Sequence, residues 1–115
     1  MPDEGALLPI VNAAWNSDPR VVEILLAAGA NPNRTTRNLP IEALFPAATR
    51  DDPDGQLIVR DLLAAGANPC VHLSGMADFP RALEGMGGLT PLEVATRYNK
   101  TGSAAELRSA MKGKC

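Results

Sequence analysis

Two segments of the chain, residues 21–26 and 58–63, place apolar side chains three and four positions apart. This spacing gathers apolar residues on one face of a helix, whereas a half-buried strand would need strict alternation. The shared face consists of Val21, Val22, Leu25 and Leu26 in the first segment and of Ile58, Val59, Leu62 and Leu63 in the second. The pattern therefore predicts two amphipathic helices.

Both predicted helices end in the same eight residues. Residues 25–32 read Leu-Leu-Ala-Ala-Gly-Ala-Asn-Pro, and the same sequence returns at residues 62–69. Gly29 and Gly66 stand where the residue after a helix takes a positive φ, and the following prolines prevent the helix from resuming. Internal repetition with a period of about 20 to 50 residues is typical of solenoids, propellers and arrays.

A shorter helix is predicted before each longer one. Residues 8–14, 39–44 and 90–95 each contain a proline followed by small or apolar residues. Proline suits the first position of a helix because its missing N–H would have no partner there. Thr90, which precedes Pro91, is a good N-cap. Each unit therefore consists of a turn, a short helix, a turn and a longer helix.

These two series of segments together resemble the ankyrin repeat. Residues 88–95, Gly-Leu-Thr-Pro-Leu-Glu-Val-Ala, look like the family's opening G-x-T-P-L-H-x-A. Residues 21–33 resemble its closing segment V-V-x-L-L-L-x-x-G-A-D-x-N. The resemblance covers about residues 7–111, and it implies an all-α ankyrin-repeat solenoid of stacked helix-turn-helix units with short hairpin-like loops.

The whole chain, residues 1–115, is expected to form a single ankyrin-repeat domain. The repeats are predicted at about residues 7–36, 37–70 and 88–113, which meets the minimum of about three for a stable stack. Residues 71–87 are expected to form a long inserted loop. Insertions of this kind cost little loop entropy and often carry function.

The second and third repeats depart from the regular unit. In the second, Pro46 is expected to end the first helix early, which favours Phe45 as a core residue. Extra residues are expected between its two helices, within residues 49–55. In the third, residues 102–111 are expected to supply the second helix, with an apolar face of Leu107, Ala110 and Met111.

Composition and charge narrow the function classes. The chain has 115 residues, aromatic residues make up only 3%, and the net charge is −2. No block of Lys and Arg is present, which disfavours a nucleic-acid partner. No long apolar run indicates a secretory signal or a membrane span, so a cytoplasmic location is expected. In that compartment Cys70 and Cys115 need no disulfide.

The resemblance implies binding through hairpin tips and through the surface of the first helices. The resemblance also implies that the two residues after the Ala-Ala of a first helix usually point into the concave groove of the stack. These are Trp15 and Asn16 in the first repeat, and Arg97 and Tyr98 hold the same places in the third. Tryptophan is enriched among interface hot spots. Trp15 has an alternative role, which is to cover the open end of the stack.

Two loops supply the other candidate partner-binding residues. The polar tip that contains Arg34, Thr36 and Arg37 could pair with carboxylates of an acidic partner, or it could be a solvated turn. In the inserted loop the candidates are Met76, Phe79 and Arg81. That loop could instead fold back on the third repeat, with a short helix at residues 79–84.

No combination of residues supports catalysis, a metal or a cofactor. Residues 51–55, Asp-Asp-Pro-Asp-Gly, lack the later Glu of a calcium loop and are typical of a turn. His72 is the only histidine, so neither a His-ligated zinc site nor a Ser-His-Asp relay is supported. Cys70 is interpreted as a hairpin residue rather than a nucleophile. Residues 85–88 have the wrong glycine spacing for a phosphate loop.

The sequence therefore predicts a non-enzymatic protein-binding module that is monomeric when free. Its expected role is to hold or occlude one partner protein, as an inhibitor, an adaptor or an immunity-type antidote does. Two alternatives remain open. The chain could be a structural subunit of a larger assembly, or an accessory that presents a substrate to an enzyme.

Overall fold

The computed structural model describes residues 9–16, 18–35, 41–50, 53–73 and 85–112 of the chain. Within these residues the backbone forms six α-helices and no strand. The helices are α1 (Pro9–Asn16), α2 (Pro19–Ala27), α3 (Leu44–Ala48), α4 (Asp54–Ala64), α5 (Pro91–Arg97) and α6 (Thr101–Met111).

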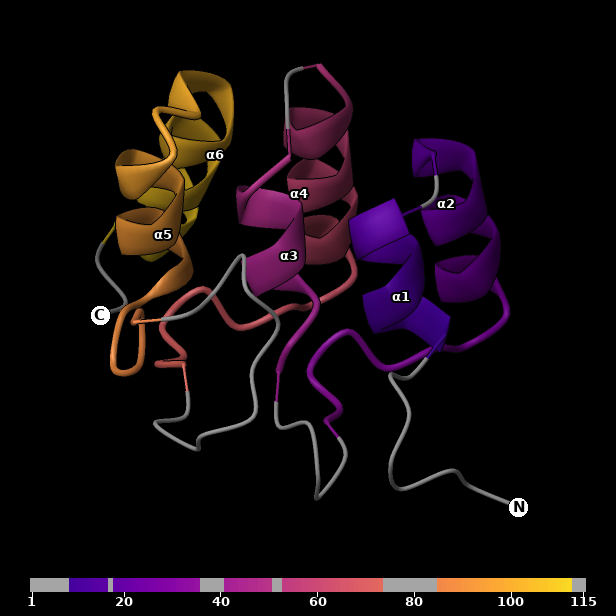
Figure 1. Ribbon diagram of the computed structural model, residues 1–115. Helices are drawn as coiled ribbons and strands as arrows, with labels where there is room; N and C mark the ends of the chain where they lie inside the picture. Colours follow the sequence, from indigo (N-terminus) through magenta and orange to yellow (C-terminus); the bar gives the residue numbers. More distant parts are fainter. Residues whose placement is uncertain (1–8, 17, 36–40, 51–52, 74–84, 113–115) are drawn as a thin grey trace.

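The helices are arranged as three pairs in two layers (Figure 1). Each odd-numbered helix packs on the helix that follows it, and the pairs stack so that α1, α3 and α5 form one layer. Helices α2, α4 and α6 form the second layer behind the first. The all-α solenoid of stacked helix pairs that the sequence predicts is therefore confirmed.

Local sequence signals explain where most of these helices begin and end. Gly29 and Gly66 have φ values of +98° and +99°, as expected for the residue that stops a helix. Thr90 caps α5: its Oγ1 accepts a hydrogen bond from the Glu93 amide, and the Glu93 carboxylate accepts one from the Thr90 amide at 2.9 Å. This reciprocal pair is a capping box, and it confirms the predicted N-cap.

The first helix of the second pair is the main correction to the predicted elements. Helix α3 begins at Leu44, so residues 41–43, which the sequence predicts as helix, precede it. It continues through Pro46 to Ala48, so the proline does not end it as expected. Pro46 lies in the first turn, where amide groups have no helical partner and a missing N–H costs nothing. Helix α4 also takes in Asp54 and Gly55, which belong to the predicted extra residues between the two helices.

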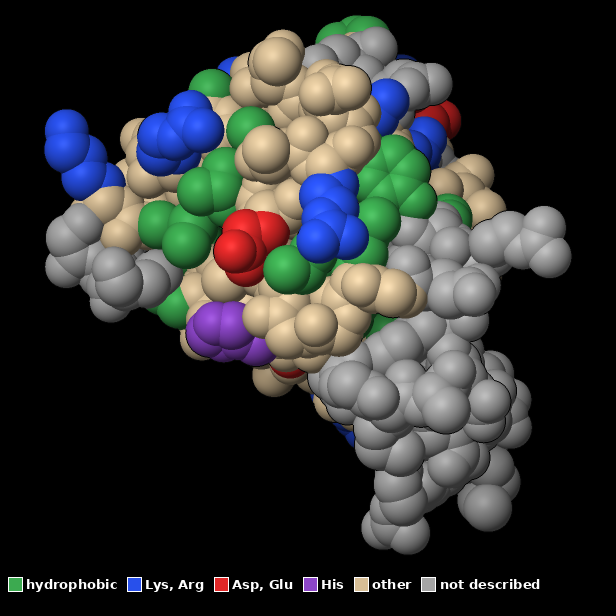
Figure 2. All heavy atoms as spheres, turned by 60° about the vertical axis from the view of Figure 1, so that its left-hand side comes forward, with side chains coloured by type: hydrophobic (Ala, Val, Ile, Leu, Met, Phe, Trp, Pro, Cys, Tyr) green, Lys and Arg blue, Asp and Glu red, His purple; other side chains and the backbone are tan. Residues whose placement is uncertain are grey.

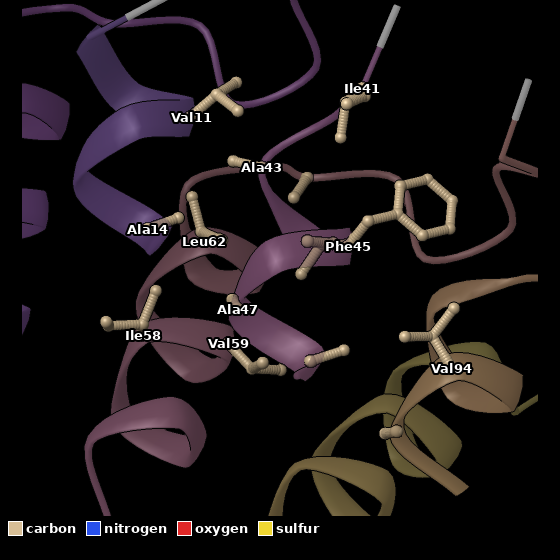
Figure 3. Packing of buried hydrophobic residues seen from close by; sticks show 14 of the residues in the cluster. Val11, Ala14, Ile41, Ala43, Phe45, Ala47, Ile58, Val59, Leu62 and Val94 are labelled. Carbon is tan, nitrogen blue, oxygen red and sulfur yellow. The ribbon is translucent and has the colours of Figure 1, made fainter. Parts of the chain in front are cut away.

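The core runs between the two layers through all three pairs. Phe45 of α3 is fully buried, as predicted, and lies between the α1 and α5 sides of the core (Figure 3). Leu107 of α6 is also fully buried, whereas Ala110 and Met111 of its expected apolar face are only partly buried. Other fully buried side chains are Ala14, Val22, Ile58, Val59, Leu62 and Val94. Aliphatic packing therefore joins the pairs into one core.

A side-chain clamp joins the turn of the first pair to that of the second. The side-chain Nδ2 of Asn33 donates to the backbone carbonyl of Gly66 at 2.9 Å. The side-chain Oδ1 of Asn33 accepts from the backbone amide of Asn68 at 2.6 Å. Asn31 and Asn68 stabilise their own turns, since each side chain accepts from the amide two residues further along. The repeated octapeptide thus gives two identical turns, and Asn33 binds one to the other.

Replacing Asn33 by alanine is expected to lower the free energy of unfolding by about 1–2 kcal/mol, because two hydrogen bonds between turns are lost. Chemical denaturation followed by circular dichroism measures the change. Asn12→Ala is the matched control, because Asn12 is exposed and its side chain accepts a hydrogen bond from Asn16 on the same helix. Equal midpoints for the two variants would show that the clamp contributes nothing.

The inserted loop at residues 71–87 is closed at its base. The Leu73 amide donates to the Leu89 carbonyl at 2.8 Å, and the Gly88 amide donates to the Leu73 carbonyl at 2.7 Å. The Leu73 side chain is buried in the core. The loop therefore leaves and re-enters the stack at one point. Residues 74–84, with the expected short helix at 79–84, lie outside the described residues.

Candidate functional site

The ends of the three first helices lie in one row. Because α1, α3 and α5 stand side by side and run in the same direction, the residues that close them fall next to one another (Figure 1). We call these residues the first-helix row: Trp15, Asn16, Thr49, Arg50, Arg97 and Tyr98. The structure thus brings together four of the candidate residues from the sequence and adds two.

The α1 end of the row combines an aromatic ring with an amide. Trp15 is partly buried and packs against the core, so part of its indole covers the stack and part remains accessible. Asn16 is exposed, and its amide donates to Asn12 Oδ1 at 2.7 Å. An indole held in place by the core loses little freedom on binding, which suits a hot spot.

Arg50 links the middle of the row to α1. Its Nη1 donates to the Ala14 carbonyl at 3.4 Å, and its Nη2 lies 4.0 Å from Asp54 Oδ2. A cation at the carboxyl end of α1 is favourable because unpaired carbonyls gather there. Thr49 bonds back to the Pro46 carbonyl at 2.8 Å. These contacts fix the backbone of the row where the second pair meets the first.

Sequence reasoning missed Thr49 and Arg50 because it placed the end of α3 too early. A signal for them exists in the chain: Ala47-Ala48-Thr49-Arg50 matches Ala13-Ala14-Trp15-Asn16 position by position. This match is not apparent while Pro46 is taken as the end of the helix. Once α3 is placed at residues 44–48, the same two positions after Ala-Ala fall in the row.

The α5 end of the row is basic and aromatic. Arg97 is exposed in the last turn of α5, and Tyr98 is partly buried against the core. Figure 2 brings the α5 and α6 end of the molecule forward, and basic side chains appear there as separate groups rather than as a continuous patch. The row is therefore suited to a partner with apolar and acidic groups rather than to a nucleic-acid backbone.

The remaining candidate residues do not join the row. Arg34 is exposed beside Pro9 at the start of α1, roughly 9 Å along the helix axis from Trp15 at 1.5 Å per residue. Thr36 and Arg37 lie outside the described residues. The same holds for the inserted-loop candidates Met76, Phe79 and Arg81.

The second helices carry two contrasting carboxyl groups. The Glu106 carboxylate accepts hydrogen bonds from Arg60 and Gln56, the shortest at 2.7 Å, and these bonds lower its pKa. The Asp61 carboxyl on α4 has a raised pKa, first because it is partly desolvated and then because the Glu23 carboxylate of α2 lies beside it. Its Oδ2 is buried without a hydrogen-bond partner. Glu106 thus joins α4 to α6, whereas Asp61 and Glu23 repel each other between α2 and α4.

Replacing Asp61 by asparagine is expected to stabilise the protein at pH 7 by about 0.5–1 kcal/mol, because one member of a like-charge pair is removed. A raised folded-state pKa means that the charged carboxylate costs stability above that pKa, and that protonation removes the cost as the pH falls through it. The gain should therefore be present at pH 7 and absent at pH 3. Thermal unfolding at both pH values measures it, with Glu23→Gln as the matched variant. A gain that is unchanged at pH 3 would contradict the pairing.

The described residues give no support for metal or cofactor chemistry. Among them no group of three or more His, Cys, Asp and Glu side chains could hold a metal ion. His72 is exposed at the base of the inserted loop. None of the described helices is long and apolar enough to cross a membrane.

Cys70 corrects one expectation from the sequence. It is disulfide-bonded, whereas the expectation was that Cys70 needs no disulfide. Cys115 lies outside the described residues. Disulfides are rare in reducing compartments, so the expected cytoplasmic location stays a prediction, and counting reactive thiols in protein from its native host would test it.

Comparison with known proteins finds a family match for one segment of the chain. The family model described as Ankyrin repeat matches residues 9–37. This segment contains α1, α2 and the turn that follows them, and it includes Trp15, Asn16 and Arg34. No curated protein and no solved structure matches the chain.

Proposed function

From the premise that the chain is an ankyrin-repeat protein, we propose that it is a non-enzymatic module that holds or occludes one partner protein. Ankyrin repeats are in general protein–protein interaction modules. The observation that supports this role here is the first-helix row, where Trp15 and Tyr98 pack partly against the core and Arg97, next to Tyr98, is exposed.

The proposed mechanism depends on rigidity. Core packing and the Asn33 clamp hold the pairs against one another, so the row is formed before a partner arrives. A preformed surface loses little conformational entropy on binding, and more of the contact energy becomes affinity. Acidic groups of the partner would pair with Arg97, and apolar groups would contact the two aromatic rings.

Within this role, we favour an inhibitor, an adaptor or an immunity-type antidote, because each acts by covering a partner. A structural subunit of a larger assembly and an accessory that presents a substrate remain the alternatives. The free protein is proposed to be monomeric and cytoplasmic. These finer roles differ in what happens to the partner after binding: an inhibitor or antidote lowers its activity, whereas an accessory raises it.

The test is a comparison of two tagged double variants expressed in the native host. Trp15→Ala/Arg97→Ala removes one side chain from each end of the row, and Arg20→Ala/Arg108→Ala removes two exposed arginines from the second helices. Quantitative mass spectrometry of the proteins that co-purify should show at least a tenfold loss of one partner for the first variant only, since hot-spot truncations cost about 2 kcal/mol or more each.

Three outcomes separate the possibilities. Selective loss with the row variant supports the proposed surface, and calorimetry with the purified partner then gives the change in affinity. Equal recovery by both variants and by the unchanged protein contradicts the role of the row. Retention of a multi-protein assembly by both variants would favour the structural-subunit alternative.

A further inference from the structure

The repeated octapeptide forms two turns of the same conformation, and the second of them binds a side-chain amide. Asn33 donates to the Gly66 carbonyl and accepts from the Asn68 amide. Gly29 and Asn31 hold the same places of the octapeptide in the first pair. Among the described residues, neither the Gly29 carbonyl nor the Asn31 amide has a hydrogen-bond partner. The first turn therefore presents the same carbonyl and amide that bind Asn33 in the second.

These two backbone groups belong to a groove at the edge of the stack, which we call the end groove. It has a volume of about 320 Å³ and lies between the start of α1 and the end of α2, the helix at the edge of the stack in Figure 1. Its lining residues are Pro9, Ile10, Leu25, Ala28, Gly29, Ala30, Asn31 and Arg34. The walls are therefore mainly apolar, with the free carbonyl and amide of the turn and one cation among them.

The face of α2 beside the end groove is apolar. Val21 is 38% exposed and Ile24 is 60% exposed. The repeated sequence makes Ile58 and Asp61 of α4 their equivalents, and α4 packs on α2 with Ile58 fully buried. The terminal units of a repeat protein normally present a polar outer face to water. The outer face of α2 instead has the apolar character of a face that another helix covers.

The contacts inside the stack indicate what a covering helix should carry. Glu23 of α2 lies beside Asp61 of α4, and the equivalent Arg60 of α4 bonds to Glu106 of α6 at 2.7 Å. In both contacts this position of one helix meets an acidic residue of the next. Ile24 replaces that acidic residue in α2. A helix in the same register therefore needs an apolar residue opposite Ile24, because a charge there would lose water without gaining a partner.

We propose that the end groove and the outer face of α2 bind an amphipathic helix-and-turn segment of a partner protein. Its apolar side chains cover Val21 and Ile24, and an asparagine in its turn bonds to the Gly29 carbonyl and the Asn31 amide. A carboxamide offers both the donor and the acceptor that these groups need, whereas a carboxylate lacks the donor and an ammonium lacks the acceptor. Arg34 in the groove favours a neutral or acidic segment over a basic one.

This inference goes beyond the proposed function, because it concerns a second binding surface. The first-helix row lies where the first helices end, whereas the end groove lies where α1 begins and α2 ends. Trp15→Ala/Arg97→Ala should leave binding at the end groove unchanged, and Ile24→Asp should leave binding at the row unchanged. The two proposals therefore fail separately.

The probe is a synthetic peptide with the sequence of residues 18–35 and the change Glu23→Leu. In the chain this segment supplies the helix and the asparagine that bind the second pair. A hydrocarbon bridge between peptide positions 24 and 28, on the side away from the contact, holds the helix, because an isolated helix this short is marginal in water. Added to the 15N-labelled full chain, the peptide should cause saturable shifts of the backbone amide signals of Ile24, Gly29 and Asn31.

Two control peptides and two protein variants test the two parts of the contact. A peptide that also carries Asn33→Leu should bind about tenfold more weakly, because both hydrogen bonds to the turn are lost. A peptide that keeps Glu23 should be weaker by about the same factor, because its carboxylate would lie against Ile24. In the protein, Ile24→Asp should weaken binding of the first peptide about tenfold. Leu57→Asp is the matched control, since Leu57 is a 39% exposed leucine on α4.

Three results would overturn the proposal. The first is the absence of saturable shifts at Gly29 and Asn31 with the first peptide. The second is equal affinity of all three peptides. The third is an occupant other than a partner protein, which would appear as nuclear Overhauser contacts between the end groove and another part of the same chain, or as a dimer in light scattering that Ile24→Asp dissociates.

Discussion

Replacing Phe45 by alanine is expected to lower the free energy of unfolding by about 3–5 kcal/mol. Phe45 is fully buried in the middle pair, with the α1 side chains on one side of it and Val94 of α5 on the other (Figure 3). Truncation removes the transfer free energy of the ring and leaves a cavity that short α3 cannot close by moving, because its neighbours on both sides are also packed.

Urea denaturation followed by circular dichroism and by Trp15 fluorescence measures this change. Because the middle pair joins the other two, both signals should shift to the same lower midpoint. Phe45→Leu is the control, since it retains most of the apolar volume and should cost much less. A loss below about 1 kcal/mol, or a shift in only one signal, would contradict a single core that depends on Phe45.

Replacing Gly55 by alanine is expected to destabilise the protein by about 1–3 kcal/mol, although glycine to alanine in a helix ordinarily stabilises it by about 1 kcal/mol. Gly55 is buried in the first turn of α4, and a Cβ added there would lie 2.6 Å from the Arg50 carbonyl oxygen. Backbone atoms cannot rotate away from such a contact, so either α4 or Arg50 must shift.

Thermal unfolding measures this effect, and Gly29→Ala serves as a comparison. The added Cβ at Gly29 meets no atom within 4 Å, but φ is +98°, so only conformational strain of about 1 kcal/mol is expected. If Gly55→Ala stabilised the protein, the close approach of Arg50 to α4 would be wrong. Because Arg50 belongs to the first-helix row, Gly55→Ala should also weaken partner binding.

Repetition explains how much of the fold the sequence could predict. The octapeptide predicts the ends of α2 and α4, because a glycine that is followed within three residues by a proline is typical of a helix C-terminus. Thr90 and Glu93 form their capping box from residues only three apart, so local sequence suffices. The bounds of helix α3 could not be predicted correctly, because Pro46 resembles a helix stop and only the structure shows that it lies in the first turn.

The candidate site also combines residues that local sequence predicts with contacts that it does not. Trp15, Asn16, Arg97 and Tyr98 follow from their register after the first helices, and the structure places all four in one row. Contacts between pairs could not be predicted from a local pattern. The Asn33 clamp, for example, joins residues 33 to 35 positions apart.

Hydrogen exchange on the complex with the purified partner tests the central claim most directly. The proposed surface predicts that the bound partner slows backbone amide exchange at residues 15–16, 49–50 and 97–98. Amide exchange in the second helices should stay unchanged. Protection confined to α2, α4 and α6, with no change along the first-helix row, would contradict the claim that this row is where the protein binds.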